Sequence, residues 1–251
     1  MVTAFPLVSG FFLDALGRKV SLMIGSLIFL LGSVIQATCS SVAVMIVGRF
    51  VAGCSIGILS TVVPLYQSEL APPHLRGGLT AIAQVMVVLG VAVAAFADAL
   101  LLPLADGWRW AILLPVLPGL VLFVGMFFLP RSPRWLVQHG QEDAALRVLL
   151  SIRDEAEARS ELQEIVLDQQ RARASGPHLR WSELCSGRNA RLLAVGVTLQ
   201  LLQQLTGINV FVSFGPRIFI SLGLDSASLQ TALMWTLFVA TLPVPWGRHE
   251  P

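Results

Sequence analysis

The stretch VSLMIGSLIFLLGSVIQAT, Val20–Thr38, contains no charged side chain and only scattered polar ones. A helix needs about 20 predominantly apolar residues to cross the hydrocarbon core of a lipid bilayer. A surface helix of a soluble domain would instead carry charges on its outer face. Because this run has the required length and composition, it predicts a membrane-spanning α-helix.

Stretches of the same kind recur along the chain. Further predicted spans are Val42–Pro64, Gly77–Leu102, Trp110–Leu129 and Leu192–Leu222, with Ala227–Val244 as an additional candidate. Val2–Leu13 is apolar but short, as expected for the end of a span whose beginning is missing. Apolar residues make up 55% of the 251 residues and charged residues only 13%, whereas soluble domains carry about a quarter charged residues. The expected fold class is therefore an all-α membrane protein.

The rest of the composition argues against several classes of function. The net charge of +2 is too small to indicate a nucleic-acid partner. Three cysteines form no framework, and four histidines are scattered singly without zinc-site spacing. No nucleophile stands with a base inside the predicted spans. We therefore expect neither an enzyme nor a bound metal or cofactor, and we expect the lipid bilayer as a partner.

The loop charges predict how the spans are oriented. Arg18 and Lys19 lie in one loop, Arg76 lies two loops later, and the segment Arg131–Asn189 contains nine Arg and nine acidic residues. Basic-rich loops alternate with basic-poor ones, so the basic set is expected to be cytoplasmic. Within the long segment, Ala145, Leu146, Leu149 and Leu150 share one helical face, and a second, highly charged helix stops at Ser175–Gly176–Pro177. Its charges form either a solvated face or a lid that touches the bundle in one transport state.

Several charged or amide side chains occur in or beside the predicted spans: Asp14, Arg49, Glu69 and Gln84. A charge at mid-membrane costs roughly 2.5–3.5 kcal/mol on insertion scales. Arg49 lies about 10 Å into its span at a helical rise of about 1.5 Å per residue. It can extend to the outer face, but a buried partner or a position facing a cavity is the favoured interpretation. Arg18 and Lys19 can bridge neighbouring carboxylates such as Glu69, which predicts a group of ion pairs at the cytoplasmic end. The alternative is that these charges only set the orientation of the spans.

The last long span contains QLLQQLTGIN, Gln200–Asn209. On a straight helix Gln200, Gln203 and Gln204 share a face, but Asn209 falls about 180° from Gln200. Gly207 permits local unwinding, and interrupted helices near mid-membrane build transporter binding sites. We therefore expect a break near Thr206–Gly207. The amides either join neighbouring helices by hydrogen bonds or bind a ligand with many hydroxyls, which suits groups that both donate and accept.

Six motifs give the chain a resemblance to a known family. They are GFFLDALGRK, GRFVAGCSIG, PLYQSELAPPHLRGG, GWRW, PRSPRWL and QQLTGIN, in this order between about Val8 and Leu224. Together they resemble the sugar porter family of the major facilitator superfamily. The resemblance implies a helical bundle of two six-helix halves that works by alternating access. It also implies transport of a monosaccharide, hexose-like, with protons as a further partner in some relatives.

The resemblance also assigns roles to residues. The positions that hydrogen-bond the sugar correspond to Gln84, Gln203, Gln204 and Asn209, with Gln200 as a weaker candidate. The cytoplasmic salt-bridge network corresponds to Asp14, Gly17, Arg18, Glu69, Arg76 and Arg134, with Lys19 beside it. In proton-coupled relatives, the arginine at the position of Arg49 faces an aspartate of the first helix. The family usually has an acidic residue where this chain has Arg131, so we expect Arg131 to point away from the network or to find its own carboxylate.

The matched motifs correspond to about helices 2 to 8 of 12. We therefore expect an incomplete bundle: residues 1–130 form an N-terminal bundle lacking helix 1, residues 131–190 a cytoplasmic helical linker, and residues 191–251 the start of a C-terminal bundle. The chain then looks like a fragment of a transporter or an incomplete gene model. Two alternatives are a sugar sensor of the same fold and an inactive truncated product. The expected location is the plasma membrane, with an organelle membrane as the alternative.

Overall fold

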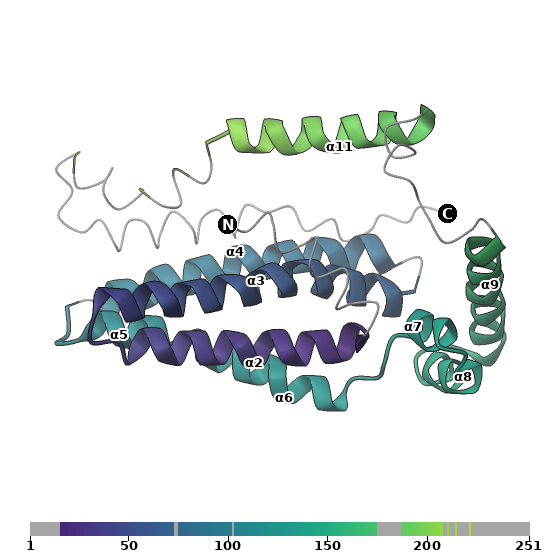
Figure 1. Ribbon diagram of the computed structural model, residues 1–251, viewed down its shortest axis with the longest axis horizontal. Coiled ribbons are helices and arrows are strands. Elements are labelled where there is room, and N and C mark those ends of the chain that lie inside the picture. The colour runs from purple at the N-terminus through teal and green to yellow at the C-terminus, as the bar shows by residue number, and fades with distance from the viewer. Residues whose placement is uncertain are drawn as a thin grey trace.

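The computed structural model describes residues 16–72, 75–101, 103–174 and 187–207, together with residues 210, 214 and 221. These residues form helices and connecting turns, with no strand among them. Helices α2 (Arg18–Ala37), α3 (Val42–Leu70) and α4 (Arg76–Leu101) are long, and α5 (Gly107–Leu113) and α6 (Val116–Phe128) follow them. Figure 1 shows α2 to α6 running side by side as a bundle. The predicted all-α architecture is confirmed for this part of the chain.

Within the described residues, four segments are long and apolar enough to cross a membrane: α2, α3, Gly77–Leu101 and Gly107–Phe128. They match the first four predicted spans in order. The ends agree with the prediction within three residues except at the end of α3, and proline accounts for that difference and for a division inside the fourth segment. Helix α3 continues through Pro64 to Leu70, because neighbouring groups in a bundle can satisfy the carbonyl that a proline leaves free. The last segment is divided at Leu114–Pro115, where Pro115 and Pro118 have no N–H to donate.

Close approach of α2 and α3 forms the centre of the bundle. A Cβ atom on Gly32 would lie 2.7 Å from the backbone nitrogen of Ala52, so this crossing requires glycine. The Ser55 hydroxyl, fully buried, donates to the Gly25 carbonyl at 2.6 Å. Small residues let helix backbones approach, and hydrogen bonds between helices add to the packing. Nearer the basic end, Leu22, Val62, Tyr66 and Met126 form a buried apolar cluster.

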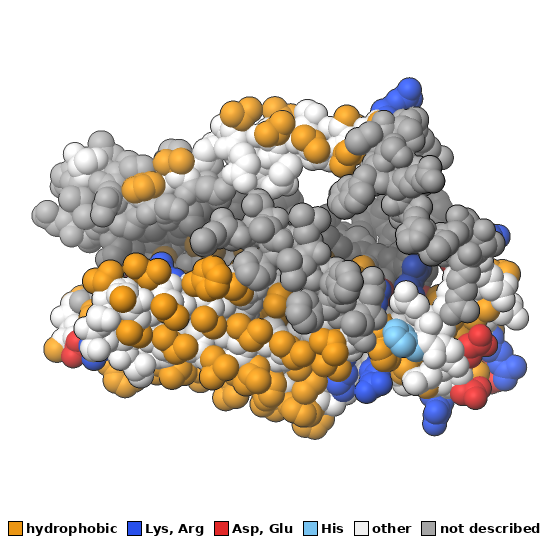
Figure 2. Space-filling view, in the orientation of Figure 1, with side chains coloured by type: hydrophobic (Ala, Val, Ile, Leu, Met, Phe, Trp, Pro, Cys, Tyr) orange, Lys and Arg blue, Asp and Glu red, His pale blue; other side chains and the backbone are white. Residues whose placement is uncertain are grey.

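The outer surface of the bundle is apolar. Large hydrophobic side chains such as Leu31 on α2 and Val121 on α6 are more than half exposed. Figure 2 shows this apolar surface over the bundle, with Lys, Arg, Asp and Glu gathered at its end and over the charged helices beside it. A soluble domain does not expose so large an apolar area, whereas a lipid-facing surface requires it.

A small helical insert follows the bundle. It comprises α7 (Pro133–Gln138), α8 (Glu142–Leu150) and α9 (Glu155–Ala174), which lie together at one end of the bundle (Figure 1). Leu136, Val137, Ala145 and Ile165 form its own apolar core. Arg153 and Glu161 make an ion pair whose side chains are mostly buried. The prediction of one apolar face on α8 is only partly right: Ala145 and Leu149 are buried, but Leu150 is 42% exposed. Leu150 lies about 100° around the helix from Leu149.

The last described helix, α11 (Gly187–Leu205), begins five residues before the predicted span starting at Leu192. It ends at Leu205, and Thr206 and Gly207 follow as a turn. Gly207 has a φ of +71°, in the left-handed region that favours glycine. The predicted break of this helix near Thr206–Gly207 is therefore confirmed. The remainder of the Leu192–Leu222 prediction and the Ala227–Val244 and Val2–Leu13 segments lie largely or wholly outside the described residues.

Candidate functional site

Glu69, in the last turn of α3, is the centre of a buried polar cluster at the basic end of the bundle. Its Oε1 atom accepts a hydrogen bond from Arg18 Nε at 3.0 Å and lies 3.0 Å from Arg18 Nη2. Its Oε2 atom accepts a hydrogen bond from the Ser132 hydroxyl at 2.5 Å. The side chains of Arg18 and Glu69 are 11% and 5% exposed. The carboxylate therefore links α2, α3 and the start of α7.

The backbone around this cluster explains how its members are positioned. Gly17 precedes α2 with a φ of +81°, and a Cβ atom there would lie 2.9 Å from the Trp135 ring. Only glycine fits both restrictions, so Gly17 acts by allowing close approach rather than by binding. Ser132 caps α7 by accepting from the Trp135 backbone N–H at 3.4 Å, while Pro133 occupies the first turn. The Tyr66 hydroxyl donates to the Pro130 carbonyl at 2.7 Å and fixes the connecting segment.

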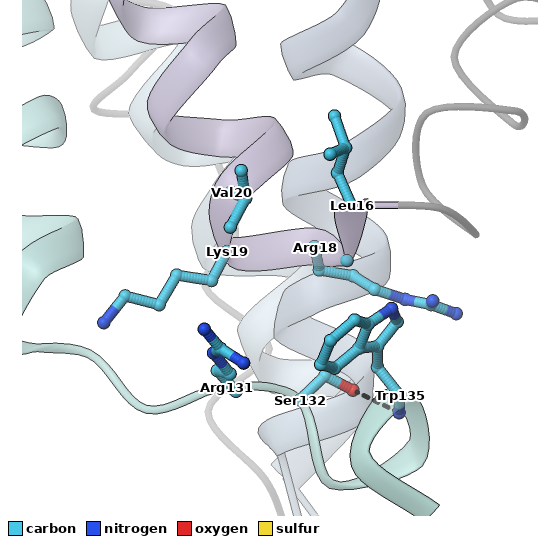
Figure 3. Close-up of a pocket in the computed structure, with 8 residues that line it drawn as sticks. Leu16, Arg18, Lys19, Val20, Arg131, Ser132 and Trp135 are labelled. Atoms are coloured by element: carbon cyan, nitrogen blue, oxygen red, sulfur yellow. Dashed lines mark hydrogen bonds between the residues drawn. The ribbon is translucent and has the colours of Figure 1, made fainter. Parts of the chain in front are cut away.

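Lys19 and Arg131 lie beside the cluster but have different contacts. The Lys19 ammonium donates to the carbonyls of Phe127 and Leu129, at 3.1 and 2.7 Å, and so caps the C-terminal end of α6. The Arg131 guanidinium carbon lies 5.5 Å from the centre of the Trp135 ring. Figure 3 shows Lys19 and Arg131 on one side and Arg18 directed to the other. As expected, Arg131 points away from Arg18, and its neighbour is an aromatic ring rather than a carboxylate.

The structure does not place every residue of the expected network at Glu69. Arg134 is exposed and lines a groove of about 220 Å³ against the acidic face of α9, which carries Glu157, Glu161, Glu164 and Asp168. Arg134 faces the insert because it already belongs to α7, which begins at Pro133. Arg76 begins α4, and its side chain is outside the description, as is Asp14 altogether. Among the predicted members, only Arg18 and Glu69 are therefore seen in direct contact.

The expected sugar-binding amides are exposed where they are described. Gln200, Gln203 and Gln204 lie on α11 and Gln84 lies on α4, and all four are exposed. The Thr206 hydroxyl donates to the Gln203 carbonyl at 2.6 Å, where α11 ends. Asn209 lies outside the described residues, so its approach to the glutamines stays a prediction. Arg49 is exposed on α3 and has no ion pair with any described residue.

Three contact residues were not found from the sequence: Ser132, Tyr66 and Trp135. The signal for Ser132 was present, because a serine directly before a proline is typical of a helix N-cap. That pattern predicts the bond to the helix backbone. It does not predict the second bond to Glu69, which is 63 residues away in the chain. The contact of Tyr66 with Pro130 is equally long-range, and the position of Trp135 depends on Gly17. No local pattern indicates either contact.

Together, an apolar bundle and a charged helical insert define a multi-pass integral membrane protein. The family model described as "Sugar (and other) transporter" matches residues 4–246. The galactose-proton symporter of Escherichia coli K12 is 36% identical over 96% of this chain and 53% of that protein. The glucose transporter GlcP of Staphylococcus epidermidis is 34% identical over 88% of this chain and 48% of that protein.

Solved structures agree with this relationship. The xylose transporter XylE from E. coli, partially occluded and inward open, has a TM-score of 0.80 at 23% identity, over 95% of this chain and 57% of that one. The proton:xylose symporter XylE bound to 6-bromo-6-deoxy-D-glucose has a TM-score of 0.84 at 26% identity, over 95% and 55%. The chain belongs to the sugar porter family of the major facilitator superfamily, whose members are transporters and not enzymes. It spans about half the length of the relatives it matches.

Proposed function

We propose that the protein transports a monosaccharide, hexose-like, across its membrane by alternating access. The observation that carries the proposal is the end of α11 at Leu205, directly after Gln203 and Gln204, with Gly207 in a left-handed conformation. Interrupted helices of this kind place polar groups at the centre of transporter bundles. Family membership and relatives named as galactose, glucose and arabinose transporters support a sugar as the substrate.

In this proposal Gln84, Gln203, Gln204 and Asn209 bind the sugar, and Gln200 lies next to them. An amide donates and accepts hydrogen bonds without a net charge, which matches a sugar hydroxyl. The exposure of the described glutamines fits a site that further helices must enclose. Loss of one amide leaves a hydroxyl and its cavity partners imperfectly paired.

The ion-pair cluster is proposed to act as a cytoplasmic gate. Glu69 holds α2, α3 and the insert together through Arg18 and Ser132. Asp14, Lys19, Arg76 and Arg134 complete the network in this proposal. Breaking and re-forming such contacts would distinguish the inward-open from the outward-open state. Arg49 is the proposed coupling residue, since it is a charge within a span and two relatives carry "proton symporter" in their names.

The test is uptake of labelled hexoses into liposomes. Alternating access requires two halves that move around a shared site, so the 251-residue chain is compared with the same chain joined to the part of the galactose-proton symporter that follows the matched region. Saturable uptake by the joined protein, lost in Gln203→Ala, supports the proposal. The chain alone is expected to move no sugar. Binding without uptake by the joined protein would indicate a sensor, and neither binding nor uptake would indicate an inactive product.

A further inference from the structure

Two cations, Lys19 and Arg131, lie together at the basic end of the bundle, and Figure 3 shows the Arg18 side chain directed away from them. Lys19 comes from the first turn of α2 and Arg131 from the segment between α6 and α7. They border a small hollow of about 10 Å³, whose wall also includes Gly17, Ser132, Trp135 and Arg18, the last of these paired with Glu69. None of the described residues that line the hollow is acidic. It has room for about one water-sized group, which fits a single phosphate oxygen but not a whole sugar or nucleotide.

The described part of the chain supplies no counter-ion for either charge. Lys19 donates to two backbone carbonyls, which satisfy hydrogen bonds but carry no formal charge. The side chain of Arg131 is exposed and rests on the Trp135 ring, which leaves its donors open to solvent. Among the described residues neither cation has a carboxylate partner. The pair is therefore suited to an anion supplied from outside the chain.

The surroundings of the pair show what kind of anion fits. Lys19 caps the carbonyl groups of Phe127 and Leu129, and Phe128 lies between these two residues in the chain. The exposed fractions are 57% for Phe127, 85% for Phe128 and 42% for Leu129. They belong to the apolar outer surface of α6, which continues away from the two cations. A ligand that matches this surface has an anionic head and an apolar tail. A basic pocket between spanning helices at the positively charged membrane face is a physical match for an acidic lipid headgroup.

We propose that Lys19 and Arg131 bind the phosphate of an anionic phospholipid in the leaflet at the basic end, with its acyl chains along Phe127 and Phe128. A zwitterionic lipid fits less well, because its ammonium group would lie near two cations, and no carboxylate is among the described residues in the wall of the hollow. The proposal does not depend on sugar transport.

The test measures lipid binding to the purified 251-residue chain by native mass spectrometry in mild detergent. Phosphatidylglycerol, phosphatidylcholine and phosphatidylethanolamine with identical acyl chains are titrated separately. The variants are Arg131→Gln, Arg131→Lys and Arg147→Gln. Arg147 is an exposed arginine on α8 and serves as the control for loss of one charge away from the bilayer. In a further arm, excess inorganic phosphate competes with phosphatidylglycerol.

The unmodified chain should prefer phosphatidylglycerol, and Arg131→Gln should weaken its binding about five-fold, the effect of about one basic residue at a membrane surface. Arg131→Lys should retain most of the affinity, which shows that charge and not misfolding is responsible, and Arg147→Gln should leave it unchanged. Equal binding of the three lipids, equal loss in Arg131→Lys and Arg131→Gln, or no loss in Arg131→Gln would overturn the proposal. Full displacement by inorganic phosphate would overturn the assignment to a lipid.

Discussion

Removing the Glu69 carboxylate should destabilise the bundle much more than removing an exposed ion pair. Glu69→Gln keeps the shape of the side chain and an oxygen that can accept from Ser132, but it takes away the charge that faces Arg18. The Arg18 guanidinium, 11% exposed, would then have lost its buried carboxylate partner. Removing one member of a buried pair typically costs about 3–5 kcal/mol. We expect the lower end of this range, about 3 kcal/mol, because Arg18 makes a further interaction and Gln remains an acceptor.

A double-mutant cycle separates the pair from other effects of the substitutions. Glu69→Gln, Arg18→Gln and the double variant are unfolded reversibly in mixed micelles and followed by circular dichroism. The coupling free energy should be about 2 kcal/mol, within the range of about 0.5–3 kcal/mol for residues in contact. The control cycle uses Arg159 and Glu155, whose charged atoms lie closer, at 2.6 Å, but whose side chains are 67% and 69% exposed. An exposed pair of this spacing should give about 0.3–0.5 kcal/mol. A coupling free energy at Glu69 no larger than at Glu155 would refute the reasoning that burial, and not distance, sets the strength.

Three further substitutions test the site and the packing. In the joined protein described above, Gln203→Ala should weaken sugar binding about 5- to 150-fold, from about 1–3 kcal/mol for an unpaired group; unchanged affinity at normal expression would favour a role in joining helices. Gly207→Ala should destabilise the chain by about 1–2 kcal/mol, because alanine is strained in the left-handed region that Gly207 occupies. Gly196→Ala, with ordinary φ and open space around it, is its control in the same unfolding assay. Gly32→Ala should cost about 1–3 kcal/mol by overpacking α2 against Ala52, whereas Gly53→Ala, with nothing within 4 Å, should cost little; equal effects would count against the proposed close crossing.

The spanning helices could be predicted from the sequence because length and apolar composition determine them locally. The predicted Val20–Thr38 and the observed Arg18–Ala37 differ by two residues at one end and one at the other. The division of the Gly107–Phe128 segment at Pro115 was missed, because apolar composition continues without change through Leu114 and Val116. Proline removes a backbone donor there, and this local signal could have been used. The break at Gly207 was predicted, because on a straight helix Gln200 and Asn209 would point in opposite directions.

The contacts of the charged cluster could be predicted only in part. Arg18 and Glu69 were expected to meet because opposite charges at the same membrane face have few other partners. The position of Arg134 beside α9 depends instead on how α7 packs against the insert core, around Leu136 and Ile165. That packing joins residues distant in sequence, and no pattern of charge or spacing specifies it. The role of Lys19 as a cap of α6 depends in the same way on the approach of α2 to α6.

The reversed charge at Arg131 should leave the Arg18–Glu69 pair unaffected. Ser132 has extended backbone angles, φ −62° and ψ 128°, and successive side chains of extended backbone point to opposite sides. Ser132 therefore reaches Glu69, while its neighbour Arg131 turns to the side of Lys19 (Figure 3). Arg18 and Ser132 both contact the Glu69 carboxylate, whereas the Arg131 guanidinium lies against the Trp135 ring. Reversing the charge with Arg131→Glu should change the coupling free energy of the Arg18–Glu69 cycle by less than about 0.5 kcal/mol, the usual limit for independent sites. A larger change, measured in the same micelles, would show that position 131 belongs to the cluster and that its side chain is not confined to the lipid-facing side.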